Sequence, residues 1–168
     1  LYRTLAQIQG ASCEEVNFNE DWSLPESFSR ADDRLKLVFL PNPNSPTGTV
    51  VSREEILDLA DRLPCPILID EAYVDFADFN CIDLVKENPK IMVSRTLSKS
   101  YGLAGLRFGF LVAQPVIIEQ LLKVKDSYNC DALSIAGATA AISDQQWLQG
   151  NVENIKSTRQ MLQEKLTQ

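Results

Sequence analysis

Apolar residues along this chain form two kinds of pattern. Short, almost continuous runs, typical of strands buried on both faces of a parallel sheet, occur at 35–40, 67–69, 91–93 and 108–112. Helices, indicated mainly by apolar residues three or four positions apart, are expected at 2–9, 52–63, 83–88, 115–124, 134–143 and 151–166. Because strands and helices alternate, the pattern predicts an α/β fold with a layered, mostly parallel sheet.

Individual residues indicate where several elements begin or end. Ser52 and Glu55 form a capping box at the start of one helix, and Pro115 suits the first turn of another. A short strand is expected at 16–18, and a polar loop with at most one helical turn at 19–33. The segment 41–48, PNPNSPTG, contains three prolines, which remove backbone donors. We therefore expect it to be a rigid loop after the strand at 35–40.

Composition narrows the class of protein. The 168 residues carry a net charge of −7 with no basic cluster, which argues against a nucleic-acid surface or an anionic membrane. No apolar run approaches the roughly 20 residues of a membrane span. The four cysteines are scattered, which favours reduced thiols in a cytoplasmic protein. The chain opens without methionine inside a helical pattern, so we expect an internal segment of a longer protein.

The chain contains no histidine, which excludes Ser-His-Asp and Cys-His nucleophile systems within it and argues against a metal site such as zinc. Lysine is then the natural proton carrier. Lys99 lies in SRTLSKSYGLAGLRFG, after one predicted strand and before another. Ligand sites in α/β folds lie at the carboxyl ends of strands, and lysine amines form imines with carbonyl compounds. A solvated loop lysine is the alternative.

Other polar residues follow the predicted strands. Arg107 suits bidentate phosphate binding or an ion pair across the sheet, and the hydroxyls of Thr96 and Ser98 suit a phosphate or a turn. Asp70 ends a buried strand, where it could pair with a protonated pyridine nitrogen, cap a helix or bind magnesium. Tyr73 could enter the same site or the core.

These motifs together resemble those of the pyridoxal-phosphate enzymes of fold type I, the aspartate aminotransferase family. The motifs are PNPNSPTG at 41–48, IDEAYVDF at 69–76, SRTLSKSYGLAGLRFGF at 94–110 and VKDSYN at 124–129. They occur in the family's order, and the similarity runs over nearly the whole chain. Within the family, the pattern is most similar to the branch that acts on histidinol phosphate in histidine biosynthesis.

The resemblance implies a role for each candidate. Lys99 would hold pyridoxal phosphate as an internal aldimine and then move the substrate proton, while Asp70 would pair with the ring nitrogen. Tyr73 would bond the 3′ oxygen of the cofactor. The phosphate would be held by Thr96, Ser98 and Arg107.

The proline loop departs from the family pattern. Most relatives have asparagine directly before Pro-Thr-Gly, where this chain has Ser45, and that asparagine contacts the ring oxygen. Here Asn44 lies one place earlier. An Asx turn is the alternative for Asn44. We expect Asn44 to make the ring contact, with Ser45 as the other candidate.

The resemblance further implies the boundaries and partners of the chain. Residues 1–143 would be part of the large cofactor-binding domain, and 144–168 a linker helix and the start of the small domain. The enzyme would be a cytoplasmic homodimer that uses an amino donor such as histidinol phosphate or glutamate and a 2-oxo acid acceptor. The segment alone is expected to be inactive. A threonine-phosphate decarboxylase and a non-catalytic domain with this fold are the alternatives.

Overall fold

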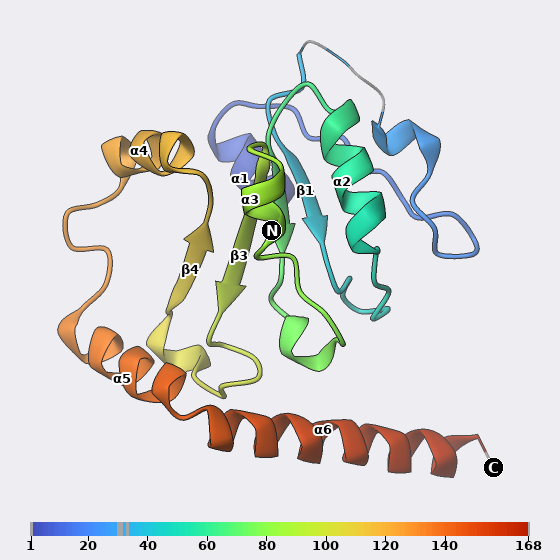
Figure 1. Cartoon of the computed structure of the whole chain (residues 1–168), viewed down its shortest axis with the longest axis vertical. Helices are drawn as coiled ribbons and strands as arrows, with labels where there is room; N and C mark the ends of the chain where they lie inside the picture. Colours follow the sequence, from blue (N-terminus) through green and yellow to red (C-terminus); the bar gives the residue numbers. More distant parts are fainter. Residues whose placement is uncertain (1, 30–31, 33, 168) are drawn as a thin grey trace.

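The computed structural model describes residues 2–29, 32 and 34–167. Four strands form one sheet in the order β1-β2-β3-β4, as Figure 1 shows. The strands are β1 (Val38–Pro41), β2 (Ile67–Asp70), β3 (Ile91–Thr96) and β4 (Gly109–Val112). The α-helices are α1 (Tyr2–Ile8), α2 (Arg53–Arg62), α3 (Leu84–Glu87), α4 (Pro115–Val124), α5 (Ala132–Ser143) and α6 (Gln145–Leu166). Single 3₁₀ turns are η1 (Glu26–Ser29), η2 (Val74–Phe76) and η3 (Ala104–Leu106).

The sheet is mixed, with two parallel strand pairs and one antiparallel pair. β1, β2 and β3 are parallel and are joined through α2 and α3, whereas β4 returns antiparallel to β3. Gly109 begins β4 opposite Thr96, and a Cβ there would lie 2.8 Å from the carbonyl oxygen of Arg95. The two strands can approach this closely only because residue 109 has no side chain. The predicted α/β fold with a mostly parallel sheet is confirmed.

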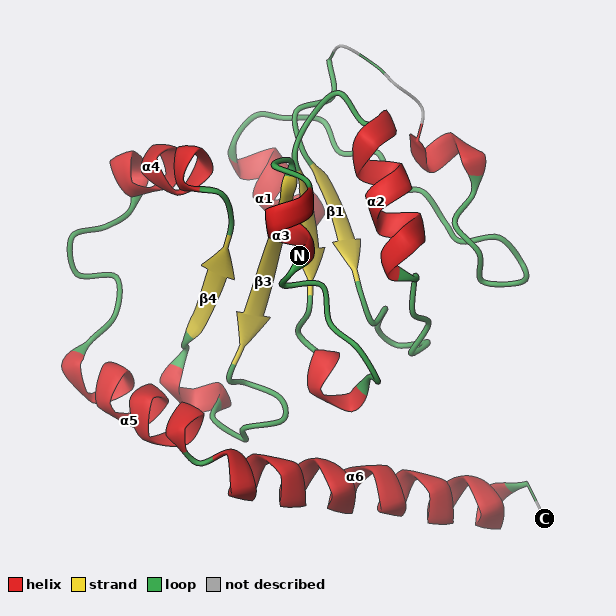
Figure 2. Cartoon of the chain, viewed as in Figure 1, coloured by secondary structure: helices red, strands yellow, loops and turns green. Residues whose placement is uncertain are grey.

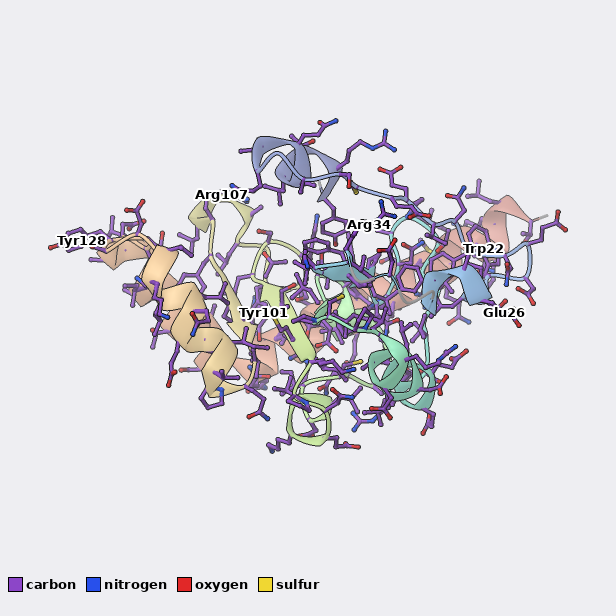
Figure 3. The ribbon with its side chains drawn as sticks, turned by 90° about the horizontal axis from the view of Figure 1, so that it is seen from above. Trp22, Glu26, Arg34, Tyr101, Arg107 and Tyr128 are labelled. Atoms are coloured by element: carbon purple, nitrogen blue, oxygen red, sulfur yellow. The ribbon has the colours of Figure 1, made fainter. Side chains whose placement is uncertain are left out.

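The main core lies between one face of the sheet and α2 and α3 (Figures 1 and 2). Ile67, Ile69 and Val93 point into it from the strands, while Ile56 and Leu84 meet them from the helices, all fully buried. Alternation along a strand sends the intervening side chains to the other face. Figure 3, seen from above, shows α1 on that opposite side. The sheet is therefore well packed on one face and only partly covered on the other.

Several element boundaries confirm the sequence signals. α2 begins with the expected capping box, in which Ser52 accepts from the Glu55 amide and Glu55 accepts from the Ser52 amide. Pro115 is the first residue of α4, and the helical turn expected within 19–33 is η1. Positions 30, 31 and 33 of that segment, like residues 1 and 168, lie outside the described residues.

Other boundaries were predicted wrongly. Residues 16–18 are irregular, because no neighbouring strand is available to pair with them, and β1 starts at Val38 rather than residue 35. Helix α5 starts two residues earlier than expected because Asp131 caps it, and α6 starts six residues earlier because Asp144 caps it. Among the described helices, none is long and apolar enough to cross a membrane.

Candidate functional site

The carboxyl ends of the parallel strands bring three loops together. β1 leads into the proline loop, β2 ends at Asp70, and β3 leads into the loop that carries Lys99. The register aligns Pro41 with Asp70 and Asp70 with Ser94, so these strands end at one edge of the sheet. Candidate residues that lie about 50 positions apart in the sequence, such as Ser45 and Lys99, therefore meet at this edge.

Asp70 points to the α1 side of the sheet and is partly buried. Its Oδ2 accepts a hydrogen bond from the Tyr2 phenol at 2.5 Å, and its Oδ1 accepts from the Ala72 amide at 3.1 Å. The Tyr2 ring stacks on Phe39 of β1, with the ring centres 4.6 Å apart. Burial, together with the hydrogen bond to Asp70 and its negative charge, raises the pKa of Tyr2 well above its usual range.

Tyr2 was missed by the sequence analysis, which treated it only as an apolar position of the first helix. It lies 68 residues before Asp70, and no local motif relates the two. A tyrosine, unlike a phenylalanine, needs a hydrogen-bond partner when it is buried. This requirement was the one signal in the sequence that Tyr2 has a polar role, and it did not identify Asp70 as the partner.

Lys99 and Tyr73 lie together at this edge. The Lys99 Nζ is 5.1 Å from the centre of the Tyr73 ring. Hydrogen bonds from Lys99 and then from Ser45 lower the pKa of the Tyr73 phenol below its ordinary value. The amine is exposed, so it is accessible to a carbonyl compound. Three loops thus contribute an amine, a phenol and a hydroxyl to one place.

The Lys99 loop is held by its neighbour Ser100, which is buried. The Ser100 hydroxyl donates a short hydrogen bond to Asp75, in η2 after Tyr73. The Ser100 carbonyl accepts from the Asn151 side chain of α6 at 2.6 Å. The backbone beside Lys99 is therefore fixed from two directions, although the lysine side chain is exposed.

Thr96 and Ser98 also lie in this region, and their hydroxyls contact each other. The Thr96 hydroxyl donates to the Ser98 hydroxyl at 2.9 Å and accepts from the Ser98 amide at 3.1 Å. The Leu97 amide donates to the Phe108 carbonyl at 3.1 Å, which continues the β3–β4 ladder. This bond brings the residue that follows Arg107 beside the loop that carries Ser98.

Arg107 lies outside β4, as the predicted strand at 108–112 implied. It ends η3 in the left-handed region, with φ 51°, and its guanidinium donates to the Ala104 carbonyl at 2.9 Å. The side chain is exposed, so no burial penalty demands a partner for it. Among the described residues, no ion pair includes Arg107. Figure 3 shows Arg107 on the same side of the sheet as α1.

The proline loop gives Asn44 and Ser45 different contacts. The Asn44 side-chain amide donates to the Thr47 hydroxyl at 2.8 Å, and the Asn44 backbone carbonyl accepts from the Gly48 amide. Ser45 is instead the loop residue that bonds Tyr73. Asn44 thus makes contacts within the proline loop, and its expected contact with the cofactor ring stays a prediction.

A buried ion pair lies behind the site and was not predicted. The Glu71 carboxylate is fully buried, and Oε2 accepts from both Nε and Nη2 of Arg95, each at 2.8 Å. Its other oxygen accepts a short hydrogen bond from the Cys81 amide. Because both oxygens are satisfied by fixed donors, the pair anchors the segment after β2 to β3 and to residue 81.

The donor set at the strand ends fits pyridoxal phosphate, the cofactor that the resemblance implies. The cofactor has a basic ring nitrogen, a carbonyl carbon beside a phenolic oxygen, and a phosphate. Asp70 offers a carboxylate, Lys99 an amine and Tyr73 a phenol. The hydroxyls of Thr96 and Ser98, with the exposed guanidinium of Arg107, offer donors to an anion.

Comparison with known proteins gives a consistent result. The family model for aminotransferase class I and II matches residues 2–168. A histidinol-phosphate aminotransferase of Rhodopirellula baltica is 59% identical over 166 residues, which cover 99% of this chain and 46% of the relative. A second such enzyme, of Trichormus variabilis, is 44% identical over 168 residues and is covered to 48%. The chain thus spans about half the length of the curated relatives it matches.

Solved structures agree on the fold. The histidinol-phosphate aminotransferase of Sinorhizobium meliloti, in complex with pyridoxal-5'-phosphate, superposes with a TM-score of 0.85 at 27% identity. That match covers 96% of this chain and 46% of the solved chain. The enzyme of Clostridium acetobutylicum gives a TM-score of 0.88 at 22% identity, over 99% of this chain and 52% of that one, and supports the fold alone.

Proposed function

Because the chain belongs to the class I and II aminotransferase family, we propose that it is the cofactor-binding part of a histidinol-phosphate aminotransferase. Such an enzyme transfers an amino group between histidinol phosphate and 2-oxoglutarate. The 59% identity to the enzyme of Rhodopirellula baltica supports this substrate assignment. The observation that carries the proposal is the meeting of Lys99, Tyr73 and Asp70 at one edge of the sheet.

Each residue of the edge has a proposed binding role. Asp70 would hold the ring nitrogen of pyridoxal phosphate, and Tyr73 the ring oxygen, with Asn44 or Ser45 beside it. Thr96, Ser98 and Arg107 would hold the phosphate. The contact between Ser45 and Tyr73 supports Ser45, since Asn44 already bonds Thr47.

When bound, pyridoxal phosphate supplies an electron sink that stabilises negative charge on a substrate carbon. The chain supplies the proton handling. Lys99 Nζ would hold the cofactor at its carbonyl carbon and, as a free amine, would accept and return a proton at Nζ. Tyr73, within hydrogen-bonding reach of that amine, would orient it, and the Asp70 carboxylate would hold the ring nitrogen.

We also propose a domain boundary at Asp144, with residues 1–143 in the large domain and 144–168 leading into a smaller one. Asp144 ends α5 and caps α6, and Figure 1 shows α6 passing below the strand ends as a separate long helix. A homodimer in the cytoplasm is proposed on the family resemblance. The four free cysteines are in keeping with the reducing compartment.

Borohydride reduction tests the proposal in the protein expressed from its complete open reading frame. Reduction in the presence of pyridoxal phosphate is expected to fix the cofactor on one peptide, the one that contains Lys99. Lys99→Ala should abolish both the label and turnover. A label on a different lysine would disprove the assignment.

The substrate is tested separately. With histidinol phosphate and 2-oxoglutarate, the enzyme is expected to form glutamate. Release of carbon dioxide from a phosphorylated amino acid, without glutamate, would instead favour the decarboxylase alternative.

A further inference from the structure

Asp70 is held by two donors, and one of them comes from a distant part of the chain. The Ala72 amide fixes Oδ1 at 3.1 Å and the Tyr2 phenol fixes Oδ2 at 2.5 Å. A carboxylate offers about four acceptor positions, so two remain for another donor. With both oxygens held, the carboxylate cannot rotate without breaking a hydrogen bond.

The position of the Tyr2 phenol is itself fixed by the sheet. Its ring lies on Phe39 at an interplanar angle of 16°. Phe39 of β1 pairs with Leu68 of β2, two residues before Asp70 on the same face of the strand. The ladder between β1 and β2 thus sets the distance from phenol to carboxylate.

On this geometry, and resting on the proposed function, we propose that Tyr2 is a positioning residue that orients Asp70 toward the ring nitrogen of the cofactor. Tyr2 acts through the carboxylate and need not touch substrate. Because burial and the neighbouring carboxylate raise the pKa of Tyr2, the phenol stays protonated and donating across the pH range in which such an enzyme works.

Tyr2→Phe is the direct test, because it keeps the ring on Phe39 and removes only the hydroxyl. Loss of a hydrogen bond to a charged group predicts about ten-fold weaker equilibrium binding of pyridoxal phosphate to the apoenzyme. We expect kcat to fall by a similar factor while KM changes less than about two-fold. The pH at which the visible absorbance of bound cofactor changes should also shift, because the ring nitrogen meets a less ordered carboxylate.

Two controls separate orientation from packing. Tyr128→Phe removes a phenol that is 95% exposed, and Phe39→Leu weakens the stack but keeps the Tyr2 hydroxyl. Tyr128→Phe is expected to leave cofactor affinity within about two-fold of wild type, and Phe39→Leu is expected to lower it less than Tyr2→Phe does. Equal losses in Phe39→Leu and Tyr2→Phe would overturn the proposal in favour of packing, and tighter binding in Tyr2→Phe would show that the phenol competes with the cofactor.

A double-mutant cycle with Asp70→Asn decides whether Tyr2 acts through Asp70. If it does, Tyr2→Phe should have little further effect on cofactor affinity in the Asp70→Asn background. Additive losses would overturn the proposal, and the melting temperature of each apoenzyme identifies a variant that fails to fold. Wild-type protein that binds no pyridoxal phosphate would contradict the proposed function, whereas normal wild-type binding with an unchanged Tyr2→Phe would contradict this inference alone.

Discussion

The Nζ of Lys99 lies 5.1 Å from the centre of the Tyr73 ring, and the amine hydrogen-bonds the phenol. The two residues belong to different loops, one after β2 and the other after β3. A cation that donates to a phenol stabilises the phenolate, which lowers the pKa of Tyr73. Their pairing therefore favours the phenolate form of Tyr73 at this edge of the sheet.

The tyrosines of the apoenzyme should therefore ionise in a defined order. The pKa of Tyr73 is lowered by Lys99 and Ser45, whereas that of Tyr2 is raised by burial and Asp70. We expect the ultraviolet difference titration of wild type minus Tyr73→Phe to show a phenol that ionises below the usual range near pH 10. The difference between wild type and Tyr2→Phe should appear only at far higher pH.

The variant Lys99→Met tests whether the lysine is the cause of the lowered Tyr73 pKa. Removing the ammonium should move the Tyr73 ionisation back toward its ordinary pKa, while Tyr2 is unaffected. An unchanged Tyr73 titration in Lys99→Met would mean that the amine does not control the phenol.

The buried pair of Glu71 and Arg95 should dominate stability at the back of the site. Arg95→Met leaves the Glu71 carboxylate buried without its cation, which is expected to cost about 3 kcal/mol or more. Chemical denaturation measures this loss. In the double variant Glu71→Gln with Arg95→Met, much of it should return, since no charge is then buried.

An exposed ion pair provides the matched control. Lys86 and Asp83 lie 3.2 Å apart with both side chains largely exposed. Lys86→Met should therefore leave the denaturation midpoint almost unchanged. A comparable loss in Lys86→Met and Arg95→Met would contradict the argument from burial.

The cysteines should react in an order set by burial and charge. Cys13 is exposed, whereas Cys65 and Cys81 are buried. Burial, with the negative charge of Glu71, raises the pKa of Cys81 to about 12. Because the thiolate is the reactive form, iodoacetamide at pH 7.5 should label Cys13 first and Cys81 last, as followed by peptide mass spectrometry. Equal rates in native protein would contradict this order, and denaturant should make the rates equal.

The same thiol predicts a pH dependence of stability. Between the ordinary thiol pKa of about 8.5 and about 12, the unfolded chain loses a proton that folded Cys81 keeps. The free energy of unfolding should therefore fall as pH rises through that range. Cys81→Ala should flatten this alkaline decline, which denaturation curves at several pH values would measure.

Gly109 should tolerate no side chain. In Gly109→Ala, the added Cβ would meet the Arg95 carbonyl oxygen at 2.8 Å, so β3 and β4 must separate at the point where the Lys99 loop begins. We expect a lower melting temperature and weaker cofactor binding. Gly150→Ala, whose Cβ would meet nothing within 4 Å, is the control and should not be destabilised.

The sequence predicted those features that depend on local pattern. The capping box of Ser52 and Glu55 and the proline at the start of α4 were found because each signal lies within a few residues of its effect. Asp70 and Lys99 could be selected because a parallel strand ends immediately before or shortly before each.

Long-range contacts were not predictable in the same way. Tyr2 meets Asp70, and Glu71 meets Arg95, through strand register that no local pattern encodes. The surrounding apolar residues indicated that an unpaired Arg107 would be costly, but η3 turns the backbone there and leaves the side chain exposed. The strand expected at 16–18 had suitable residues and no partner strand.

The bond from Asn151 to the Ser100 carbonyl joins α6 to the residue beside Lys99. From Asn151 to Leu166, the helix extends about 22 Å at 1.5 Å per residue. A tilt of about ten degrees at Asn151 would thus displace the far end by about 4 Å and the hydrogen bond hardly at all. The start of α6 is therefore tied to the lysine loop, whereas the direction of the rest of the helix can change with little displacement of the Ser100 carbonyl.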